Sequence, residues 1–371
     1  MTGFPEAFQQ LLSESVGPER AAAVLEALGQ EASVSIRLNP SKLRECPFPD
    51  AQPVAWSPWG YLLKERPVFT LDPLFHAGCY YVQDSSAMYV GHVFREVGEY
   101  LQPGAAVLDL CAAPGGKTTD LAASLREKLG DAFFLVANEV MRSRYGILRS
   151  NVESWGDPCV GTVSRDSSVF GQAPVFDLVL ADVPCSGEGM FRKDARAVEE
   201  WSLGAVEFCA ARSRRILSGV WPGLKPGGIL LYSTCTFNHH ENEDTADWIA
   251  RELGAEILQS KRLLPGQVPG EGQYVAALRK DGTYSAMGKA DVFSLFRAER
   301  PVAALPDHPR WELDRDTALR YLHGDALILA PEAPTGFLTL CYQGQALGAA
   351  KNLGKRCNNL YPKSRRIQMD V

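Results

Sequence analysis

Two cysteines in this sequence follow apolar runs that are typical of buried strands. Cys185 comes directly after "FDLVLADVP", and Cys235 ends the run "GGILLYSTC". A thiolate is a strong nucleophile, but a free thiol is mostly protonated at neutral pH, so a reactive cysteine needs surroundings that favour its anion. Asn238 and Glu241 resemble the capping of a helix that starts behind Cys235, and the positive end of that helix would favour the thiolate. An isolated cysteine would more simply be a buried packing residue.

Two adjacent histidines, His239 and His240, stand in the same stretch and suggest a metal site. Neighbouring residues of a helix point to different faces, however, and no third ligand is spaced so that it would join the two imidazoles. We therefore expect no metal ion here.

The segment from Ala105 onward alternates between strands and helices. Strands are expected in "AVLDLC", "FFLVANEV", "CVGTVSRD" and the two runs that lead to the cysteines. Helices are expected over residues 117–129, 142–155 and 246–258, with one long amphipathic helix from Arg196 to Val220. This alternation predicts an α/β fold in which helices cover both faces of a mostly parallel sheet.

Ligands of such a sheet bind outside the carboxyl ends of its strands, so the polar residues at those ends form the candidate site. Every predicted strand delivers a carboxylate, a thiol or a glycine-rich loop to that edge. In chain order these are Asp109 with the loop 111–118, Glu139, Asp166, Asp182 with Cys185, and Thr234 with Cys235.

The loop 111–118, "CAAPGGKT", follows a strand and opens a helix, so its backbone can approach a ligand closely. It has neither the glycine spacing of the dinucleotide fingerprint nor that of the P-loop. Glu139, at the end of the next strand, stands where an acid that binds a ribose belongs. These features favour a nucleoside cofactor without a diphosphate, for which S-adenosylmethionine is the candidate. A generic tight turn is the alternative interpretation of the loop.

A thiol, a carboxylate and a methyl donor at one sheet edge predict a particular reaction. Carbon 5 of cytosine is too weak a nucleophile to attack a sulfonium methyl group unaided, but thiolate addition at carbon 6 converts the ring into an enamine that can. A carboxylic acid at ring nitrogen 3 would stabilise the charge that develops there. The carbon 5 proton must then leave and the thiol must be expelled, a step in which a second thiol could help.

The segments on either side of this core differ from it in pattern. Residues 4–29 suit two short helices, and "SVSIRLNP" and "VAWSPWGYLLK" suit strands. The signal weakens between Pro265 and Gly272, and a small mixed α/β module begins at about Asp291. We expect three domains, over residues 1–100, 101–285 and 286–371.

The composition is that of an ordinary globular protein, with 371 residues of which 46% are hydrophobic and 22% charged. No run approaches the roughly 18 apolar residues of a membrane helix, and the N-terminus lacks a basic segment followed by an apolar one. Nine cysteines without CxxC spacing argue against disulfides and a zinc finger. We expect a cytoplasmic monomer with reduced thiols and no membrane association.

A net charge of −6 means that nucleic-acid binding would depend on local basic patches. A solvated charged face is the simpler interpretation of any one cluster, but the tail is different because Asn358, Asn359 and Tyr361 stand among its cations. The candidate cations are Arg142, Arg144, Arg192, Lys193, Arg212, Arg214, Arg215, Lys351, Lys355, Arg356, Lys363, Arg365 and Arg366.

At these residues the sequence resembles the Sun/RsmF family of RNA cytosine-5 methyltransferases. "LDLCAAPGGKT", "DVPCSGEG" and "YSTCT" are similar to its cofactor loop and its two cysteine motifs, in the same order. "IRLNP" and "HAGCYYVQDSSAM" resemble its N-terminal signature and the segment that leads into its catalytic domain, and "KNLGKRCNNLYPKSRRI" resembles the PUA-like C-terminal module of the RsmF branch. The resemblance thus spans nearly the whole chain.

The resemblance implies a Rossmann-like class I methyltransferase core between a small N-terminal α/β domain and a PUA-like RNA-binding module. It implies that Cys235 attacks, that Cys185 assists product release, that Asp182 recognises the cytosine and that Lys117 belongs to the catalytic group. The residues that would line the S-adenosylmethionine site are Cys111, Ala112, Ala113, Pro114, Gly115, Gly116, Lys117, Glu139, Arg144, Asp166 and Asp182.

Recognition should involve an unstacked base, because the target cytosine must reach a pocket at the sheet edge. The resemblance favours small-subunit ribosomal RNA as substrate, with transfer RNA second. Two other functions are disfavoured: a non-catalytic RNA-binding factor in ribosome assembly would not need both thiols, and the "STC" element and the tail module argue against a DNA enzyme that uses Cys185 as nucleophile.

Overall fold

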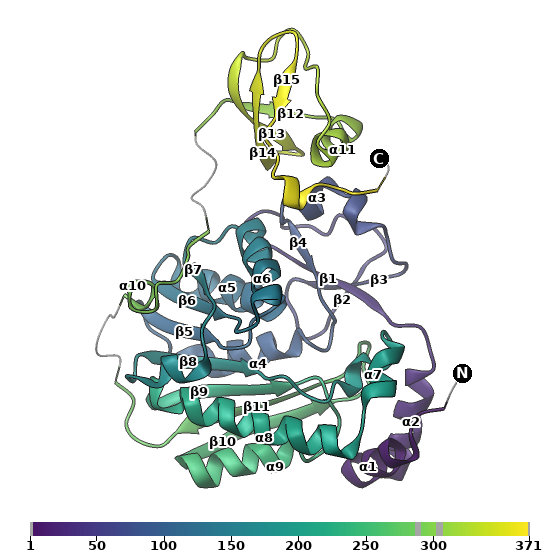
Figure 1. Ribbon diagram of the computed structural model, residues 1–371, viewed down its shortest axis with the longest axis vertical. Helices are drawn as coiled ribbons and strands as arrows, with labels where there is room; N and C mark the ends of the chain where they lie inside the picture. Colours follow the sequence, from purple (N-terminus) through teal and green to yellow (C-terminus); the bar gives the residue numbers. More distant parts are fainter. Residues whose placement is uncertain (1–2, 286–290, 302–306, 370–371) are drawn as a thin grey trace.

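The computed structural model describes residues 3–285, 291–301 and 307–369, and its strands form three sheets (Figure 1). A seven-stranded sheet has the order β10-β11-β9-β8-β5-β6-β7. A four-stranded sheet from the N-terminal part has the order β2-β3-β1-β4, and one from the C-terminal part has the order β12-β13-β14-β15. In Figure 1 the C-terminal sheet stands at the top of the molecule, and the first two helices lie at the bottom.

The seven-stranded sheet is mostly parallel, as the sequence predicts. Its parallel strands are β5 (Ala105–Asp109), β6 (Phe133–Asn138), β7 (Val160–Val163), β8 (Phe176–Asp182) and β9 (Leu224–Thr234). Two further strands, β10 (Ala255–Leu263) and β11 (Gln273–Lys280), extend it in antiparallel fashion beside β9. The expectation of a helix through residue 258 is wrong there, because α9 (Glu243–Trp248) and a π-helical turn (Ile249–Gly254) end before β10.

Helices cover both faces of this sheet because its strands are apolar on both sides. Val107 and Leu135 belong to one buried core, whereas their neighbours Leu108 and Val136 belong to the core on the other face. The first core includes α4 (Tyr89–Val97), α5 (Gly116–Leu129) and α6 (Arg142–Trp155). The second includes α8 (Leu203–Val220), α9 and α10 (Val292–Phe296).

The long helix expected from Arg196 to Val220 is two helices, α7 (Ala195–Glu200) and α8. Trp201 between them is extended and buried, and its indole N–H donates to Glu188 at 3.1 Å. Ser202 then caps α8 by accepting a hydrogen bond from the backbone N–H of Ala205. The apolar pattern continues across the break, so helical periodicity alone does not reveal it.

The two helices expected at the N-terminus are present as α1 (Glu6–Val16) and α2 (Pro18–Leu28). They pack against Phe191, Trp201 and Phe237, next to the loops that carry the cysteines. The small sheet that follows consists of β1 (Val34–Leu38), β2 (Gln52–Pro53), β3 (Gly60–Leu63) and β4 (Tyr80–Val82), with the short helix α3 (Pro73–His76) before β4. The strand expected over "VAWSPWGYLLK" is therefore limited to its last part.

The C-terminal module consists of β12 (Arg310–Glu312), α11 (Arg315–His323), β13 (Gly336–Tyr342), β14 (Gln345–Asn352) and β15 (Cys357–Asn359). Its apolar residues Leu319 and Leu322 share one core with Ile36, Leu38 and Tyr80 of the N-terminal sheet. The domain boundaries near residues 100 and 285 stay predictions, and residues 286–290 lie outside the described part of the chain.

The remaining short elements are 3-10 helices, namely η1 (Phe69–Leu71), η2 (Gly98–Tyr100), η3 (Ser167–Gly171), η4 (Glu188–Met190), η5 (Trp221–Gly223) and η7 (Lys363–Arg365). None of the helices in the described residues is long and apolar enough to cross a membrane.

Candidate active site

The two cysteines meet at the carboxyl edge of the central sheet. Cys235 follows β9 and Cys185 follows the neighbouring parallel strand β8, whose last residue, Asp182, pairs in register with Ser233. The two sulfur atoms are 3.4 Å apart, within hydrogen-bonding distance for thiols. The structure thus brings together the two elements that are 50 residues apart in the sequence.

The contact between the two thiols shifts their pKa values in opposite directions. A hydrogen bond from Cys185 lowers the pKa of Cys235, and this effect outweighs the opposing effect of burial. The positive charge of Lys117 lowers the pKa of Cys235 further. The same hydrogen bond, together with burial, raises the pKa of Cys185 well above that of a free thiol. These opposite shifts favour the thiolate at Cys235 and the protonated thiol at Cys185.

An ion pair lies beside the thiols. The Lys117 ammonium is 2.9 Å from Oδ2 of Asp182, and Gln273 of β11 donates to Oδ1 of the same carboxylate at 3.3 Å. Burial alone would lower the pKa of Lys117, but its bond with Asp182 raises it above the usual value. A fixed positive charge therefore faces the reactive edge. Gln273 was missed in the sequence, because β11 itself was not expected.

Two buried glutamates hold the cysteine loops together. Glu241 accepts hydrogen bonds from the backbone N–H of Ser186, at 2.9 Å, and from its hydroxyl. Glu188 accepts from the backbone N–H groups of Phe237 and Asn238 at 2.6 and 3.1 Å. Each glutamate thus bridges the segment after Cys185 and the segment after Cys235. Burial raises the pKa of Glu241 to about 7.

The helix expected to begin at Asn238 begins later. Asn238 does accept a hydrogen bond from the backbone N–H of Glu241 at 3.0 Å, but residues 239–242 form a turn and α9 starts at Glu243. Because Glu241 is used to hold Ser186, it does not complete a capping box at Asn238. The acidity of Cys235 therefore depends on Cys185 and Lys117 rather than on the predicted helix start.

The loop 111–118 connects β5 to α5, as expected, and Gly115 adopts a φ of 112°, which favours glycine. At its base, Asp109 accepts a hydrogen bond from the Thr118 hydroxyl at 2.6 Å through Oδ2. Its other oxygen, Oδ1, is buried and has no hydrogen-bond partner among the described residues. Burial raises the pKa of Asp109 to about 7. A buried acceptor without a partner is costly unless a ligand donates to it.

Glu139 directly follows β6, and Arg144 of α6 approaches it beside the loop. Glu139 is buried and accepts from the backbone N–H of Met141 at 2.8 Å, while Arg144 lies 3.4 Å from its other oxygen. Arg144 also donates to the carbonyl of Ala113 at 2.7 Å, so it links the acid to the loop. Asp166 follows β7, is exposed and caps the short helix η3 through Ser168.

Arg37 is a site residue that sequence reasoning missed. It is fully buried on β1, donates to the carbonyl of Gly116 at 3.0 Å and to the Thr119 hydroxyl, and stacks on Trp155. Burial lowers its pKa, and the charge of Asp120 partly compensates. The N-terminal sheet thereby fixes the start of α5. An arginine within the apolar strand "SIRL" was the signal in the sequence.

Comparison with known proteins decides the family. The model of the 16S rRNA methyltransferase RsmB/F matches residues 100–279, that of the N-terminal domain of 16S rRNA methyltransferase RsmF matches 4–85, and that of the methyltransferase RsmF PUA domain matches 309–367. The chain belongs to the RsmB/F methyltransferase family. The resemblance that the cysteine and cofactor-loop motifs indicate is thereby confirmed, together with the Rossmann-like core and its two smaller parts.

The chain matches a little more than half of the length of the first relative and nearly the whole length of another. Ribosomal RNA small subunit methyltransferase F of Cronobacter sakazakii is 34% identical over 281 residues, which are 71% of this chain and 57% of that protein. The protein of the same description from Enterobacter sp. strain 638 is 27% identical over 97% of this chain and 95% of its own. A solved methyltransferase homologue from Pyrococcus horikoshii has a TM-score of 0.64 and 27% identity, over 75% of this chain and 96% of its own.

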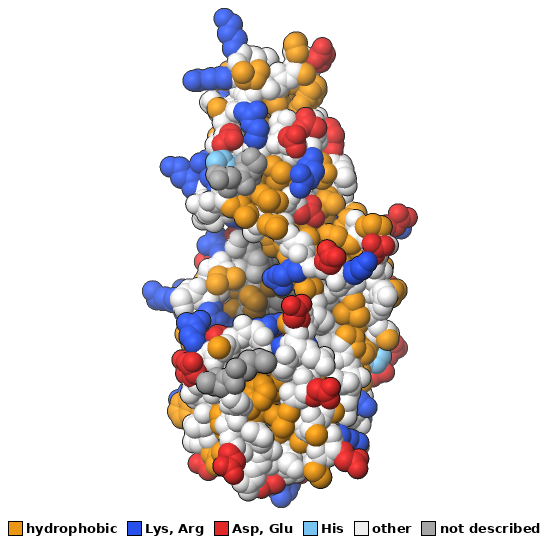
Figure 2. Space-filling model, turned by 90° about the vertical axis from the view of Figure 1, so that its right-hand side faces the viewer, with side chains coloured by type: hydrophobic (Ala, Val, Ile, Leu, Met, Phe, Trp, Pro, Cys, Tyr) orange, Lys and Arg blue, Asp and Glu red, His pale blue; other side chains and the backbone are white. Residues whose placement is uncertain are grey.

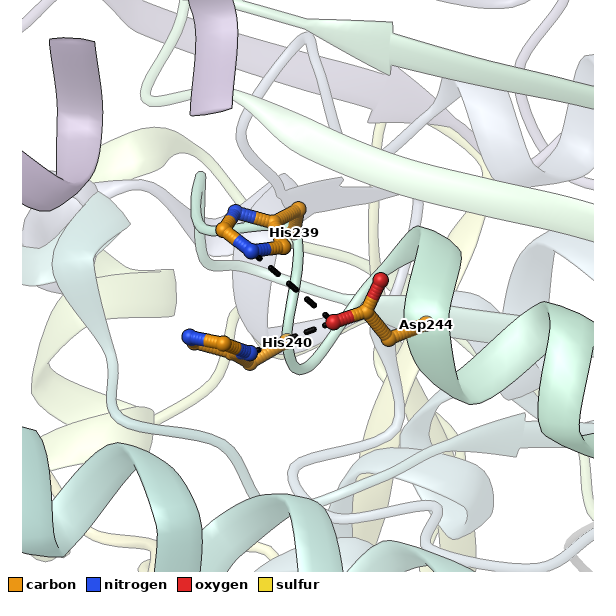
Figure 3. A group of neighbouring side chains, drawn as sticks. All are labelled: His239, His240 and Asp244. Carbon is orange, nitrogen blue, oxygen red and sulfur yellow. Dashed lines mark hydrogen bonds and ion pairs between the residues drawn. The ribbon is translucent and has the colours of Figure 1, made fainter. Parts of the chain in front are cut away.

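The geometric reason for rejecting a metal at the histidine pair is wrong. His239 and His240 lie in the turn before α9, not on a helix, so their rings are only 4.1 Å apart between centroids. Asp244 of α9 approaches both of them (Figure 3), at 3.8 Å from His239 and 3.1 Å from His240. A third possible ligand is thus present, because the turn brings residue 244 back towards residue 239.

Not all candidate cations of this RsmB/F family member are free for phosphate. Arg192 is mostly buried against Glu271 at 3.1 Å, and Arg365 donates to the backbone of Ser150 in α6 at 2.6 Å. The expectation that these two arginines bind phosphate is therefore wrong, because both make structural contacts within the protein. Figure 2 shows Lys and Arg side chains along one edge of the upper part of the molecule, where the C-terminal module lies. The exposed cations of that module's tail are Lys351, Lys355, Arg356 and Lys363.

Proposed function

We propose that this protein methylates carbon 5 of cytosine in small-subunit ribosomal RNA, with S-adenosylmethionine as methyl donor and a covalent adduct of Cys235 as intermediate. The observation that carries the proposal is the 3.4 Å contact between Cys185 and Cys235 beside the Lys117–Asp182 ion pair. A single buried cysteine could be explained by packing alone. Two thiols whose pKa values are shifted in opposite directions, next to a fixed cation, are instead typical of nucleophilic catalysis.

The residues around the loop 111–118 suit S-adenosylmethionine. When bound, the cofactor supplies an electrophilic methyl group on a sulfonium centre. The unpartnered Oδ1 of Asp109 is a buried acceptor for a donor group of the ligand, and Glu139 is placed to bind ribose hydroxyls. Arg144 holds Glu139 and the Ala113 carbonyl in place. Asp166, at the exposed end of the same edge, completes the proposed set.

Attack on the base begins with the Cys235 thiolate, which forms a carbon–sulfur bond at carbon 6. The electrons of the 5,6 double bond then become available at carbon 5, which takes the methyl group. Asp182, as a carboxylate paired with Lys117, accepts a hydrogen bond from the amino group of cytosine, and the Lys117 cation stabilises negative charge on the ring. The expectation of a carboxylic acid at nitrogen 3 is thus modified in favour of an ion pair.

Product release requires the reverse of the first step. Carbon 5 passes its proton to a water molecule, the electrons of that C–H bond re-form the 5,6 double bond, and the bond between carbon 6 and sulfur breaks with its electrons going to sulfur. Cys185 keeps its proton and lies 3.4 Å from that sulfur, so its S–H stabilises the departing thiolate. This contact supports distinct roles for the two cysteines.

The proposed substrate rests on the RNA named in the descriptions of the relatives and on the C-terminal module. The exposed cations Lys351, Lys355, Arg356 and Lys363 give that module a local positive charge despite the acidic chain. The target base must leave its stack to reach the sheet edge, and single-stranded or loop cytosines meet this requirement at the lowest cost.

The test compares variants with radiolabelled methyl donor and three RNA preparations: 16S rRNA, assembled small subunits and transfer RNA. Cys235→Ala should abolish methyl transfer, and Cys185→Ala should accumulate a protein–RNA adduct that survives denaturation, because release fails. Cys209→Ala, which changes a half-buried thiol of α8, is the matched control.

Bisulfite sequencing of the labelled RNA would then locate the methylated cytosine. An adduct trapped by Cys235→Ala instead of Cys185→Ala would reverse the proposed roles, and labelling of transfer RNA alone would replace the proposed substrate. RNA binding without any methyl transfer by the unmodified protein would favour the non-catalytic alternative.

A further inference from the structure

Three possible metal ligands converge outside the proposed active site. Oδ2 of Asp244 lies 3.8 Å from Nε2 of His239 and 3.1 Å from Nδ1 of His240 (Figure 3). All three ligand atoms lie within 4.8 Å of one another. Around a tetrahedral zinc ion, ligands at about 2.0–2.2 Å from the metal would be about 3.3–3.6 Å apart, so small side-chain rotations suffice.

The hydrogen bonds of Ser15 decide which nitrogen of His239 is free. Ser15 has a single hydroxyl proton, and it donates that proton to the carbonyl of Leu11 at 2.7 Å. The hydroxyl oxygen must therefore act as acceptor for Nδ1 of His239, 2.9 Å away, as it does for the His239 backbone N–H at 3.1 Å. Nδ1 consequently carries the proton in the neutral ring, and Nε2 presents its lone pair to the Asp244 carboxylate.

A lone pair that faces a carboxylate is unfavourable unless a cation lies between them. Either a second proton on the imidazole or a metal ion can remove this repulsion. We propose that His239, His240 and Asp244 bind one divalent transition-metal ion, with Zn²⁺ as the reference ion. Two neutral imidazoles and one carboxylate are a ligand set that zinc and similar metals prefer, and the Ser15 contact orients one imidazole in the way that supporting hydrogen bonds do in metal sites.

The surroundings leave room for the ion and for water ligands. The side chains of His239, His240 and Asp244 are 32%, 46% and 45% exposed, so solvent reaches the remaining coordination positions. A hollow of about 360 Å³ adjoins His239 and is also lined by Ser15, Arg20, Glu243 and Arg262. The Arg262 charge is paired with Glu243, so it does not add an unpaired positive charge to this lining.

The proposed ion would act on structure rather than on the methyl group. His239 bonds to Ser15 of α1, so the metal would fix the N-terminal helix pair to the turn behind Cys235. That turn also contains Glu241, which holds the loop after Cys185. The inference does not depend on the proposed methyl transfer.

The test is a titration of the metal-free full chain with Zn²⁺ by calorimetry and with Co²⁺ by absorption. Because the Cys185–Cys235 pair could bind these ions too, the decisive titration uses the Cys185→Ser/Cys235→Ser double variant. There we expect one equivalent of Co²⁺ with visible bands but without the ultraviolet charge-transfer band of a thiolate ligand. Added Zn²⁺ should also raise the melting temperature.

Ligand variants in the same background complete the test. Asp244→Asn and His240→Ala should weaken binding at least about tenfold, and Ser15→Ala should weaken it by about 10–100-fold, the range for residues that orient a ligand. The matched control is His92→Ala, since His92 also faces a carboxylate, Glu96 at 3.3 Å, but with no third ligand among the described residues. Loss of all binding in the thiol double variant, or undiminished binding by Asp244→Asn, would overturn the proposal.

Discussion

Replacing Cys185 by alanine should change the acidity of Cys235 by a calculable amount. The substitution removes the S–H group that lies 3.4 Å from the Cys235 sulfur and lowers its pKa. Hydrogen bonds to charged acceptors contribute about 1.5–3 kcal/mol, and sulfur is a weak donor, so we take about 1.4 kcal/mol. That free energy corresponds to about one pKa unit.

The rate of reaction with an aromatic disulfide reagent measures this change. Raising the pKa by one unit lowers the thiolate fraction tenfold at low pH, but the more basic thiolate is about threefold more nucleophilic. Cys185→Ala should therefore react about threefold more slowly than the unmodified protein at low pH and about threefold faster at high pH. The two rate profiles should cross, which general unfolding would not produce.

Three controls make the measurement specific. Cys235→Ala gives the background from the other thiols, and Cys209→Ala should leave the profile unchanged. Cys185→Ser keeps a hydrogen-bond donor and should retain the lowered pKa of Cys235. Identical profiles for Cys185→Ala and the unmodified protein would refute the conclusion that Cys185 donates to Cys235.

Two further predictions concern buried charges. Burial raises the pKa of Glu241 to about 7, so the folded state binds this proton more tightly than the unfolded state and stability falls as pH rises from about 4.5 to about 7. Glu241→Gln should remove up to about 3 kcal/mol of this loss of stability, measured by urea unfolding between about pH 4.5 and pH 7. A smaller decrease of stability with pH should remain in the variant, because the pKa of Asp109 is also raised to about 7. Arg37→Met should lower the free energy of unfolding by about 3 kcal/mol and weaken cofactor binding, because the Gly116 carbonyl and the Asp120 carboxylate each lose a buried partner. An equal loss of stability in the control Arg44→Met, which changes an exposed arginine, would contradict this reasoning.

The parallel core could be predicted from the sequence because its signals are local. Apolar runs such as "AVLDLC" mark buried strands, and α6 covers the same residues as the predicted helix over 142–155. β10 could not be predicted in this way, since it lies at the sheet's edge, is mostly only partly buried and carries the consecutive cations Lys261 and Arg262. β11 does contain a buried apolar run, "YVAAL", and that signal was missed. The break between α7 and α8 at Trp201 could not be predicted from periodicity either, because a buried tryptophan continues the apolar pattern of a helix.

The residues of the candidate site also fall into two groups, those that could be predicted from local sequence and those that could not. Strand-end residues such as Asp182 and Cys235 follow from the rule that parallel strands end at one edge. Gln273, Glu188 and Arg37 do not, because each reaches the site from an element whose position depends on long-range packing. The geometric expectation for His239 and His240 failed for a local reason: a turn was interpreted as a helix, so the approach of Asp244 was not foreseen.

The core shared by the N-terminal sheet and the C-terminal module sets the order in which the chain can fold as it leaves the ribosome. Ile36 and Leu38 are synthesised early, but Leu319 and Leu322, which belong to the same core, come near the end. At about 5–20 residues per second, the apolar face of the early sheet waits on the order of 15 s to a minute for its cover. During that interval the apolar face is exposed and prone to aggregation, and a chain that stops before residue 313 lacks the residues that cover it.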